Sequence, residues 1–329
     1  MNIQYKEDVL RNGFEQTVIT QRDDYEGKVT ATLVRKLSSS ESNKAILCIH
    51  GFNDYFFQEI LAEKFVEKGY HFYALDLRKY GRSILKNHIP NNVRDLSEYY
   101  EDIDKALAII RDESNTEVVL YGHSTGGLII TLYAAERKKT PLFDVLVCNS
   151  PFYDFNIPWL HKKVGIPFLA FLGRLFPNLV LPIGFSKFYG KSLHKNDFGE
   201  WDYNLKWKPH VAPSINAGWI NAIYQGHLKI AKGILVAKPI LILHSLHSVY
   251  PKKWSNEMFE GDAILNVKDI IEKSKLIEAP CKEVIGFKGA IHDLVLSKLE
   301  VRNLVFETIF TQLNLFLKNN SKVEEKVKI

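Results

Sequence analysis

Cysteine is scarce in this sequence, whose 329 residues include only Cys48, Cys148 and Cys281. An odd number of cysteines without close spacing argues against both a disulfide framework and a cysteine-ligated metal site. All three lie in apolar, strand-like runs. We therefore expect buried free thiols and a reducing, cytoplasmic environment.

Strong charge of one sign is also lacking. The 43 basic and 38 acidic residues leave a formal net charge of +5, and the basic residues form no stripe with interleaved aromatic side chains. Nucleic acid is therefore not an expected partner. The apolar share of 46% and the charged share of 25% are typical of a globular protein.

The chain has no long uninterrupted apolar run. Residues 1–13, MNIQYKEDVLRNG, are polar, which predicts no signal peptide. The most apolar stretch, residues 164–185, contains three prolines and Arg174. Such interruptions argue against a membrane-spanning helix.

Apolar strand-like runs alternate with helical patterns in the first half of the chain. The alternation predicts βαβ units and a parallel sheet that is covered by helices on both faces. Two further strands, EQTVIT and KVTATLVRKL, are joined by a short turn and predict an antiparallel edge. The alternating strands are predicted at residues 44–52, 71–77, 117–122 and 143–150, and the helices at 58–69, 95–114 and 126–138.

Residues 151–238 interrupt this alternation, because they are rich in aromatic residues, glycine and proline and show no clean period. The sequence therefore predicts an α/β fold with a mostly parallel eight-stranded sheet and helices on both faces. The core comprises residues 1–150 and 239–329 and is divided by an insertion at residues 151–238. After the insertion, strands are predicted at 238–245 and 281–287, and helices at 263–274 and 301–319.

The segment VVLYGHSTGGLIITLYAAE places Ser124 between Gly122 and Gly126, where a strand gives way to a helix. A strand–serine–helix turn strains the backbone and needs small flanking residues, which the two glycines supply. Such a turn lifts the hydroxyl above the N-terminus of the next helix, where the N–H of Thr125 and the helix dipole favour an oxyanion. In this context Ser124 is predicted to be a nucleophile rather than part of a plain turn.

A second oxyanion donor and a general base are expected at the same edge of the sheet. A His-Gly pair ends the preceding core strand, so the N–H of Phe52 is the candidate donor. Of the 11 histidines, His292 is favoured as the base because it lies in a loop after the strand at 281–287. His244 and His247 are the alternatives.

The acid that orients the base is expected in the loop after the strand at 238–245. Asp262 is the first aspartate after that strand, and the chain order Ser, Asp, His favours it. Glu257, Glu260 and Asp293 are alternatives. An aspartate before a helix pattern is also a common plain N-cap.

These motifs together resemble the α/β-hydrolase superfamily, and within it the monoacylglycerol lipase, lysophospholipase and serine aminopeptidase (S33-like) group. HGFNDY looks like the oxyanion loop of that group, LDLRKYGRS like its strand-4 segment, GHSTGG like its nucleophile elbow, GDAILNV like its acid loop and GAIHDLVLS like its histidine loop. The resemblance implies Ser/Asp/His chemistry and an inserted helical cap or lid, which residues 151–238 would form. The chain departs from the family pattern at residues 244–261, which intervene before the acid, and Ser245 replaces the usual glycine.

The resemblance implies a serine hydrolase that cleaves carboxylic esters, such as monoacylglycerol or lysophospholipid, through an acyl-enzyme and without a metal or cofactor. The HGGPG-type loop of proline iminopeptidases is absent, which favours esters. Asp197, Glu200 and Asp202 keep an aminopeptidase or amidase open as the alternative. A noncatalytic ligand-binding protein of the same fold and an acyltransferase are further alternatives.

The apolar stretch at residues 164–185 has two interpretations. One is a lid that faces lipid and contacts membrane surfaces with help from Lys162 and Lys163. The other is a segment that packs against the core domain. The sequence leaves the acyl chain length, the head group and the oligomeric state open.

Overall fold

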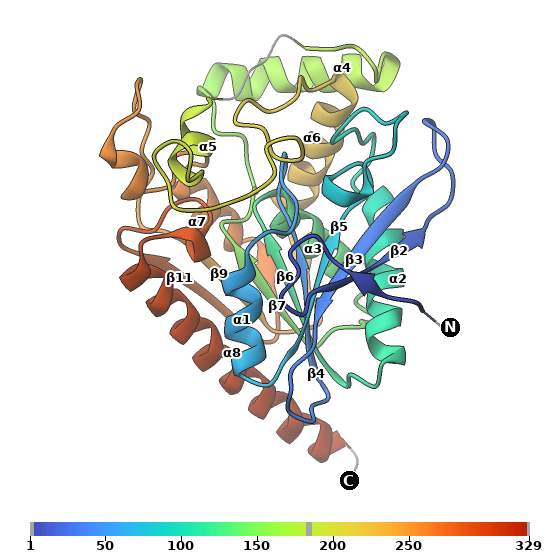
Figure 1. Cartoon of the computed structure of the whole chain (residues 1–329). Coiled ribbons are helices and arrows are strands. Elements are labelled where there is room, and N and C mark those ends of the chain that lie inside the picture. The colour runs from blue at the N-terminus through green and yellow to red at the C-terminus, as the bar shows by residue number, and fades with distance from the viewer. Residues whose placement is uncertain (1–2, 182–185, 328–329) are drawn as a thin grey trace.

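One nine-stranded sheet forms the centre of the molecule (Figure 1). The computed structural model describes residues 3–181 and 186–327, with side chains as far as residue 318. In spatial order the strands are β1 (Lys6–Glu7), β2 (Glu15–Thr20), β3 (Thr30–Lys36), β5 (His71–Asp76), β4 (Lys44–Ile49), β6 (Glu117–His123), β7 (Val145–Asn149), β9 (Ile240–Ser245) and β11 (Lys282–Phe287).

The strand directions confirm the predicted mixed sheet. The strands β4, β5, β6, β7, β9 and β11 run parallel to one another. The strands β1, β2 and β3 extend the sheet at one edge with antiparallel pairing. All eight predicted strands form. The ninth strand is β1, whose two residues are too few to give an apolar pattern in the sequence.

Helices cover both faces of the sheet and enclose two separate cores. Successive strand residues point to opposite faces, so Ile46 of β4 lies in one core and Leu47 in the other. The core around Ile46 includes α1 (Glu59–Glu67) and α8 (Leu299–Val327). The core around Leu47 includes α2 (Glu98–Asp112), α3 (Thr125–Glu136) and α7 (Val267–Ser274).

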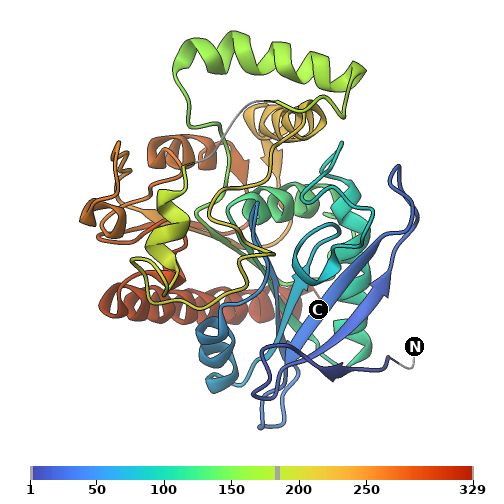
Figure 2. The ribbon, with the colours of Figure 1, turned by 45° about the horizontal axis from the view of Figure 1, so that its top comes forward.

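Residues 151–238 leave the sheet after β7 and return to it at β9. Their described part contains a π-helical turn (His161–Gly165), α4 (Ile166–Leu175), α5 (Phe188–Leu193), α6 (Ala217–Ala231) and β8 (Ile234–Leu235), which pairs with β10 (Ile277–Glu278). Figures 1 and 2 show α4 as the outermost helix, lying across α6 and away from the sheet. The two helices touch at Gly173, where an ideal Cβ atom would lie 2.0 Å from the carbonyl oxygen of Ala217.

The predicted apolar stretch at 164–185 therefore forms α4 and the turn that follows it, and its residues 182–185 lie outside the described residues. Within the described parts of the chain, we find no helix that is both long and apolar enough to cross a membrane.

Candidate active site

Three predicted site residues come together at the carboxyl ends of the parallel strands. The Oγ atom of Ser124 lies 3.0 Å from Nε2 of His292, and Nδ1 of His292 lies 2.9 Å from Oδ2 of Asp262. Ser124 follows β6, Asp262 lies in the loop after β9, and His292 lies in the loop after β11. All three side chains are buried. The geometry is that of a hydrogen-bonded chain from a hydroxyl through an imidazole to a carboxylate.

Ser124 occupies a strained backbone position between β6 and α3. Its φ is +55° and its ψ is −116°, a conformation that residues other than glycine rarely adopt. Its N–H donates to the carbonyl of Asn149 at 2.9 Å, and its own carbonyl accepts from the N–H groups of Leu128 and Phe152. These bonds from β7 and α3 hold the strained turn, which presents the hydroxyl to His292.

The two glycines beside Ser124 allow three backbones to meet. An ideal Cβ atom on Gly122 would lie 2.6 Å from the carbonyl oxygen of Gly126, and one on Gly126 would lie 2.4 Å from the carbonyl oxygen of His50. Both neighbours are backbone atoms, which cannot move aside independently. Only glycine therefore lets β6, α3 and the loop after β4 approach closely enough to form the elbow.

We expect Gly126→Ala to lower the free energy of unfolding by about 3 kcal/mol, because overpacking against backbone is relieved only by moving the elbow. The measurement is urea-induced unfolding followed by far-UV circular dichroism. Gly165→Ala is the matched control, since its nearest neighbour, Cβ of His161, would lie 3.9 Å away. That control should leave stability unchanged or raise it by about 0.5–1 kcal/mol. Equal effects of the two substitutions would contradict the close approach at Gly126.

The loop of residues 246–261 does not displace Asp262. An isolated β-bridge closes the loop at its base, where the N–H of Asp262 donates to the carbonyl of His247 and the carbonyl of Asp262 accepts from Val249. Oδ1 of Asp262 accepts the N–H groups of Ile264 and Leu265, both at 2.8 Å. These two bonds fix the carboxylate so that Oδ2 faces His292.

The loop tip rests on the inserted segment. The ring of Trp254 stacks on Phe198 with a centroid distance of 3.7 Å, and its Nε1–H donates to Oγ of Ser192 in α5. The extra residues before the acid therefore connect the core to the inserted segment.

The plain N-cap interpretation of Asp262 is wrong, as is the predicted helix start at residue 263. The helix α7 begins at Val267 and is capped by Asn266, whose side chain accepts the N–H of Lys268. Residues 263–266 instead form the turn whose N–H groups bind the carboxylate of Asp262.

The alternative bases and acids lie outside the chain of hydrogen bonds from Ser124 to Asp262. His244 bonds through Nδ1 to the carbonyl of Ser245, and burial lowers the pKa of His244. Glu260 pairs with Lys298, and His247 and Glu257 are exposed. Asp293 bonds to a separate network of buried polar groups.

The candidate oxyanion loop lies against Ser124. An ideal Cβ atom on Gly51 would lie 3.1 Å from Cβ of Ser124. His50 donates from Nδ1 to the carbonyl of Gly51 at 2.8 Å and accepts the N–H of Leu77 at Nε2, which holds the loop in place. Phe52 follows, and its ring contacts Trp219 of α6 at 4.7 Å between centroids. The N–H of Thr125 is one of the first four of α3, where the helix dipole is positive.

A buried network that was not predicted from the sequence holds the loop of His292. Asp293 accepts from Nδ2 of Asn149 at 2.7 Å and from Nε2 of Gln58 at 3.2 Å, and the N–H of Leu294 donates to Oδ1 of Asn149. The N–H of Asp293 donates to the hydroxyl of Tyr189 in α5. These residues come from separate segments, so no local sequence pattern indicates their contact.

Two aromatic side chains border His292. The ring of Tyr189 lies 5.8 Å from the imidazole of His292, and burial raises the pKa of Tyr189. The ring of His123 lies 4.8 Å from it on another side, and burial lowers the pKa of His123. Burial therefore favours the neutral form of His123 beside His292.

Comparison with known proteins finds a matching family. The sequence profile of the family described as serine aminopeptidase, S33, matches residues 40–261. No curated protein sequence matches the chain.

Several solved structures share the fold. A soluble variant of monoglyceride lipase from Saccharomyces cerevisiae, bound to a substrate analog, has a TM-score of 0.67 and 18% identity, covering 96% of this chain and 98% of that one. A monoacylglycerol lipase from Paleococcus ferrophilus has a TM-score of 0.61 and 18% identity, covering 85% and 98%. A carboxyl esterase from Bacillus coagulans, in complex with glycerol, has a TM-score of 0.61 and 14% identity, covering 92% and 98%.

The profile covers more than half of the chain, including the elbow and the oxyanion loop, and the fold aligns with these solved structures over most of their length. The protein therefore belongs to the serine aminopeptidase S33 family and has the α/β-hydrolase fold.

Proposed function

We propose that the protein is a serine hydrolase that cleaves carboxylic esters of lipophilic acyl groups, such as monoacylglycerols or lysophospholipids. The observation that carries the proposal is the buried chain from Ser124 through His292 to Asp262, with distances of 3.0 and 2.9 Å. These hydrogen bonds can activate the hydroxyl of Ser124 without a metal or cofactor.

The mechanism follows from the positions of the groups. As Oγ of Ser124 bonds to the acyl carbon, its proton passes to Nε2 of His292, while Asp262 holds Nδ1–H and stabilises the imidazolium. The N–H groups of Phe52 and Thr125 stabilise the oxyanion. His292 then returns the proton to the leaving alcohol as the ester C–O bond breaks. Water repeats the sequence on the acyl-enzyme, which releases the carboxylic acid and restores Ser124.

An aminopeptidase is the alternative within the family, and the charge pairing argues against it. A peptidase of this kind needs carboxylates that are available to bind a free amino terminus. Here Asp197 pairs with Lys191 at 2.7 Å, Asp202 with Lys195 at 2.6 Å and Glu200 with Arg302 at 2.5 Å. Each of the acidic residues that left the amide alternative open thus has a basic partner within ion-pair distance. The lipases and esterases among the structural relatives support the ester class.

A panel of p-nitrophenyl esters from acetate to palmitate, with a monoacylglycerol, a lysophospholipid and an aminoacyl amide, tests the substrate class. We expect turnover of the esters, with an optimum at a medium or long acyl chain. Cleavage of the amide alone would establish the peptidase. Transfer of the acyl group to added glycerol in preference to water would establish an acyltransferase, and no turnover of any substrate would favour a noncatalytic binding protein.

We further propose that residues 151–238 form a cap that delivers lipid substrates from a membrane surface. One face of the helical segment at 160–175 points outward, and large apolar side chains recur on it every three or four residues. They are 57–62% exposed, which is unusual for large apolar residues in a monomer. This surface, the α4 outer face, comprises Leu160, Val164, Phe168, Phe171 and Leu175.

The charges around the α4 outer face fit an anionic lipid surface. Lys163 and Arg174 are exposed on the same helical segment. Lys162, which the sequence analysis grouped with Lys163, is instead bound to Asp154 and Asp269 at 3.3 and 2.8 Å. The apolar stripe with basic flanks is typical of a helix that lies in the membrane interface. The free cysteines agree with a cytoplasmic location.

We expect Phe168→Ser combined with Phe171→Ser to lower the partition onto anionic phospholipid vesicles by about tenfold or more, because two large side chains no longer enter the interface. Vesicle flotation measures the partition. Hydrolysis of p-nitrophenyl butyrate in solution should stay unchanged. Leu304→Ser is the matched control, since Leu304 is 52% exposed on α8. If vesicle binding persists and a dimer instead becomes a monomer, the α4 outer face binds a second copy of the chain.

A further inference from the structure

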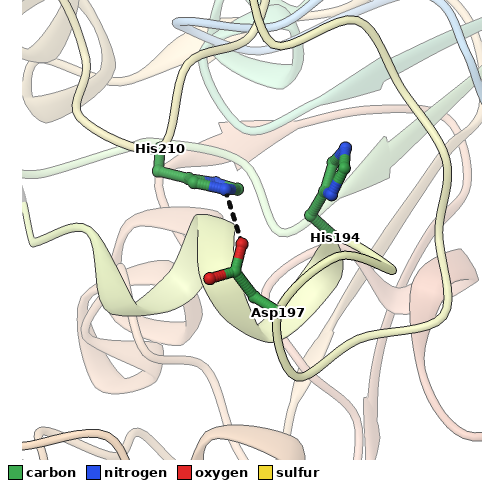
Figure 3. Close-up of side chains that lie close together, drawn as sticks. All are labelled: His194, Asp197 and His210. Atoms are coloured by element: carbon green, nitrogen blue, oxygen red, sulfur yellow. Dashed lines mark ion pairs between the residues drawn. The ribbon is translucent and has the colours of Figure 1, made fainter.

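Three metal-ligating side chains converge in the inserted segment, outside the candidate active site. His194 directly follows the last residue of α5, and Asp197 lies in the next turn. His210 lies in the loop that leads to α6 (Figure 3). One ligand atom from each side chain lies within 4.8 Å of the others. We propose that these residues bind one Zn²⁺ ion, which fastens α5 to the loop before α6.

The ligand set suits zinc. Two imidazoles and one carboxylate are a common protein contribution to a tetrahedral zinc site, with the fourth place taken by water. Bonds of about 2.0–2.2 Å would hold the ligand atoms roughly 3.3–3.6 Å apart. Nε2 of His210 already lies 2.9 Å from Oδ2 of Asp197. The His194 ring therefore needs to approach by about 1 Å to complete the site.

His194 is held in the tautomer that a ligand requires. Its Nδ1 accepts the N–H of Asn196 at 3.1 Å, so the proton is on Nε2, which donates to the carbonyl of Tyr203 at 3.2 Å. A histidine that binds a metal usually donates its other ring N–H in this way. The imidazole of His194 is 2% exposed, so its orientation is fixed by packing as well as by these bonds. The ion would replace the N–H of Asn196 at Nδ1.

His210 is only half satisfied by its protein partners. Within the described residues its Nδ1 atom is buried and has no hydrogen-bond partner. The ring lies against α5, where an ideal Cβ atom on Gly190 would be 3.0 Å from Nδ1. Nε2 is the ring nitrogen that faces Asp197, so an ion bound there would leave the proton of His210 on Nδ1.

Lys191 sets the strength of the site. Its ammonium lies 2.7 Å from Oδ1 of Asp197, which leaves Oδ2 for the ion. The positive charge of Lys191 offsets the negative charge of Asp197 and repels a divalent cation. Removing the charge while keeping the aliphatic stem should therefore tighten zinc binding, a direction that is opposite to the effect of removing a ligand.

The proposed ion would act on the wall of the candidate active site. The helix α5 carries Tyr189, whose hydroxyl accepts the N–H of Asp293 beside His292 at 3.0 Å. It also carries Ser192, which accepts a hydrogen bond from Trp254 of the 246–261 loop. A metal at the end of α5 would hold both contacts in place. The proposal itself does not depend on the ester chemistry.

The three residues follow no recognised metal-ligand spacing along the chain. His194 and Asp197 are separated by two residues, and His210 joins them only through the fold of the intervening loop, where Tyr203 donates to the carbonyl of Gly190 at 2.9 Å.

The test is equilibrium dialysis of the full chain, without an affinity tag, against micromolar ZnCl2, with bound zinc measured by mass spectrometry. We expect one ion per chain, and Asp197→Asn should weaken binding more than about tenfold. Lys191→Met should tighten it, a gain that a misfolded variant does not produce. His161→Asn, which removes an exposed histidine from the π-helical turn, should change nothing.

The proposal is overturned by any of three results. The first is the lack of saturable zinc binding. The second is binding that Asp197→Asn leaves unchanged, which would place the ion elsewhere. The third is weaker binding by Lys191→Met, which would show that Lys191 supports the cluster rather than competes with the ion. Because the readout is bound zinc, these outcomes are independent of whether the protein hydrolyses esters.

Discussion

Replacing Ser124 with alanine is expected to lower kcat for a p-nitrophenyl ester by roughly 10⁴- to 10⁶-fold, the effect of removing the nucleophile from a triad that acts as a unit. The value of KM should change little, because Oγ of Ser124 bonds to His292 rather than to the part of the substrate that fills the binding site. The burst of p-nitrophenol that accompanies acylation should disappear. Stopped-flow and steady-state absorbance measure both quantities.

Ser150→Ala is the matched control for this loss. Ser150 also follows a parallel strand with a positive φ, +47°, and it is also buried. Its Oγ atom has no hydrogen-bond partner among the described residues, so the substitution removes no bond. Activity should therefore be retained. A Ser124→Ala variant that keeps ester hydrolysis at the level of Ser150→Ala would contradict nucleophilic catalysis by Ser124.

The second large effect is expected for Asp262→Asn, which should lower kcat by about 10⁴-fold through the wrong tautomer of the base. Oδ1 of Asp262 accepts two backbone N–H groups, from Ile264 and Leu265. The oxygen of an asparagine must take that place, so its NH2 group faces Nδ1 of His292. Nδ1 then has to accept a hydrogen bond, Nε2 carries the proton, and His292 cannot receive the proton of Ser124.

Comparison with two other carboxylates tests the assignment of the acid. Asp293→Asn keeps an oxygen for Asn149 and leaves the carboxylate of Asp262 at His292, so it should lower kcat far less. Glu260→Gln removes a surface pair with Lys298 and should have no effect on kcat. An Asp293→Asn variant that is less active than Asp262→Asn would show that Asp293 orients the base.

Local patterns in the sequence explain why most of the fold could be predicted. The eight long strands and the main helices each consist of one contiguous run with its own period, such as β6 and α3 on either side of Ser124. The elbow is also local, because the serine and both glycines lie within five residues. Asp262 and His292 could be predicted because each lies after a strand and because they follow Ser124 in the order Ser, Asp, His.

Contacts between distant segments account for what could not be predicted. The bridge between Ser248 and Asp262, which returns the chain to the acid after a long loop, has no apolar period. The network of Gln58, Asn149 and Asp293 depends on three separate segments that meet only in the folded protein. The apolar period of the helix at 166–175 is the same whether it packs on the core or faces solvent, so its exposure emerged only from the structure.

The most direct test of the central claim is covalent labelling with a fluorophosphonate, followed by mass spectrometry of the intact chain and its peptides. We expect one phosphonyl group per chain, bound to Oγ of Ser124 with loss of fluoride, and loss of ester hydrolysis at the same rate as labelling. Ester hydrolysis that continues while Ser124 stays unmodified, or that is lost through labelling of another residue, would contradict it.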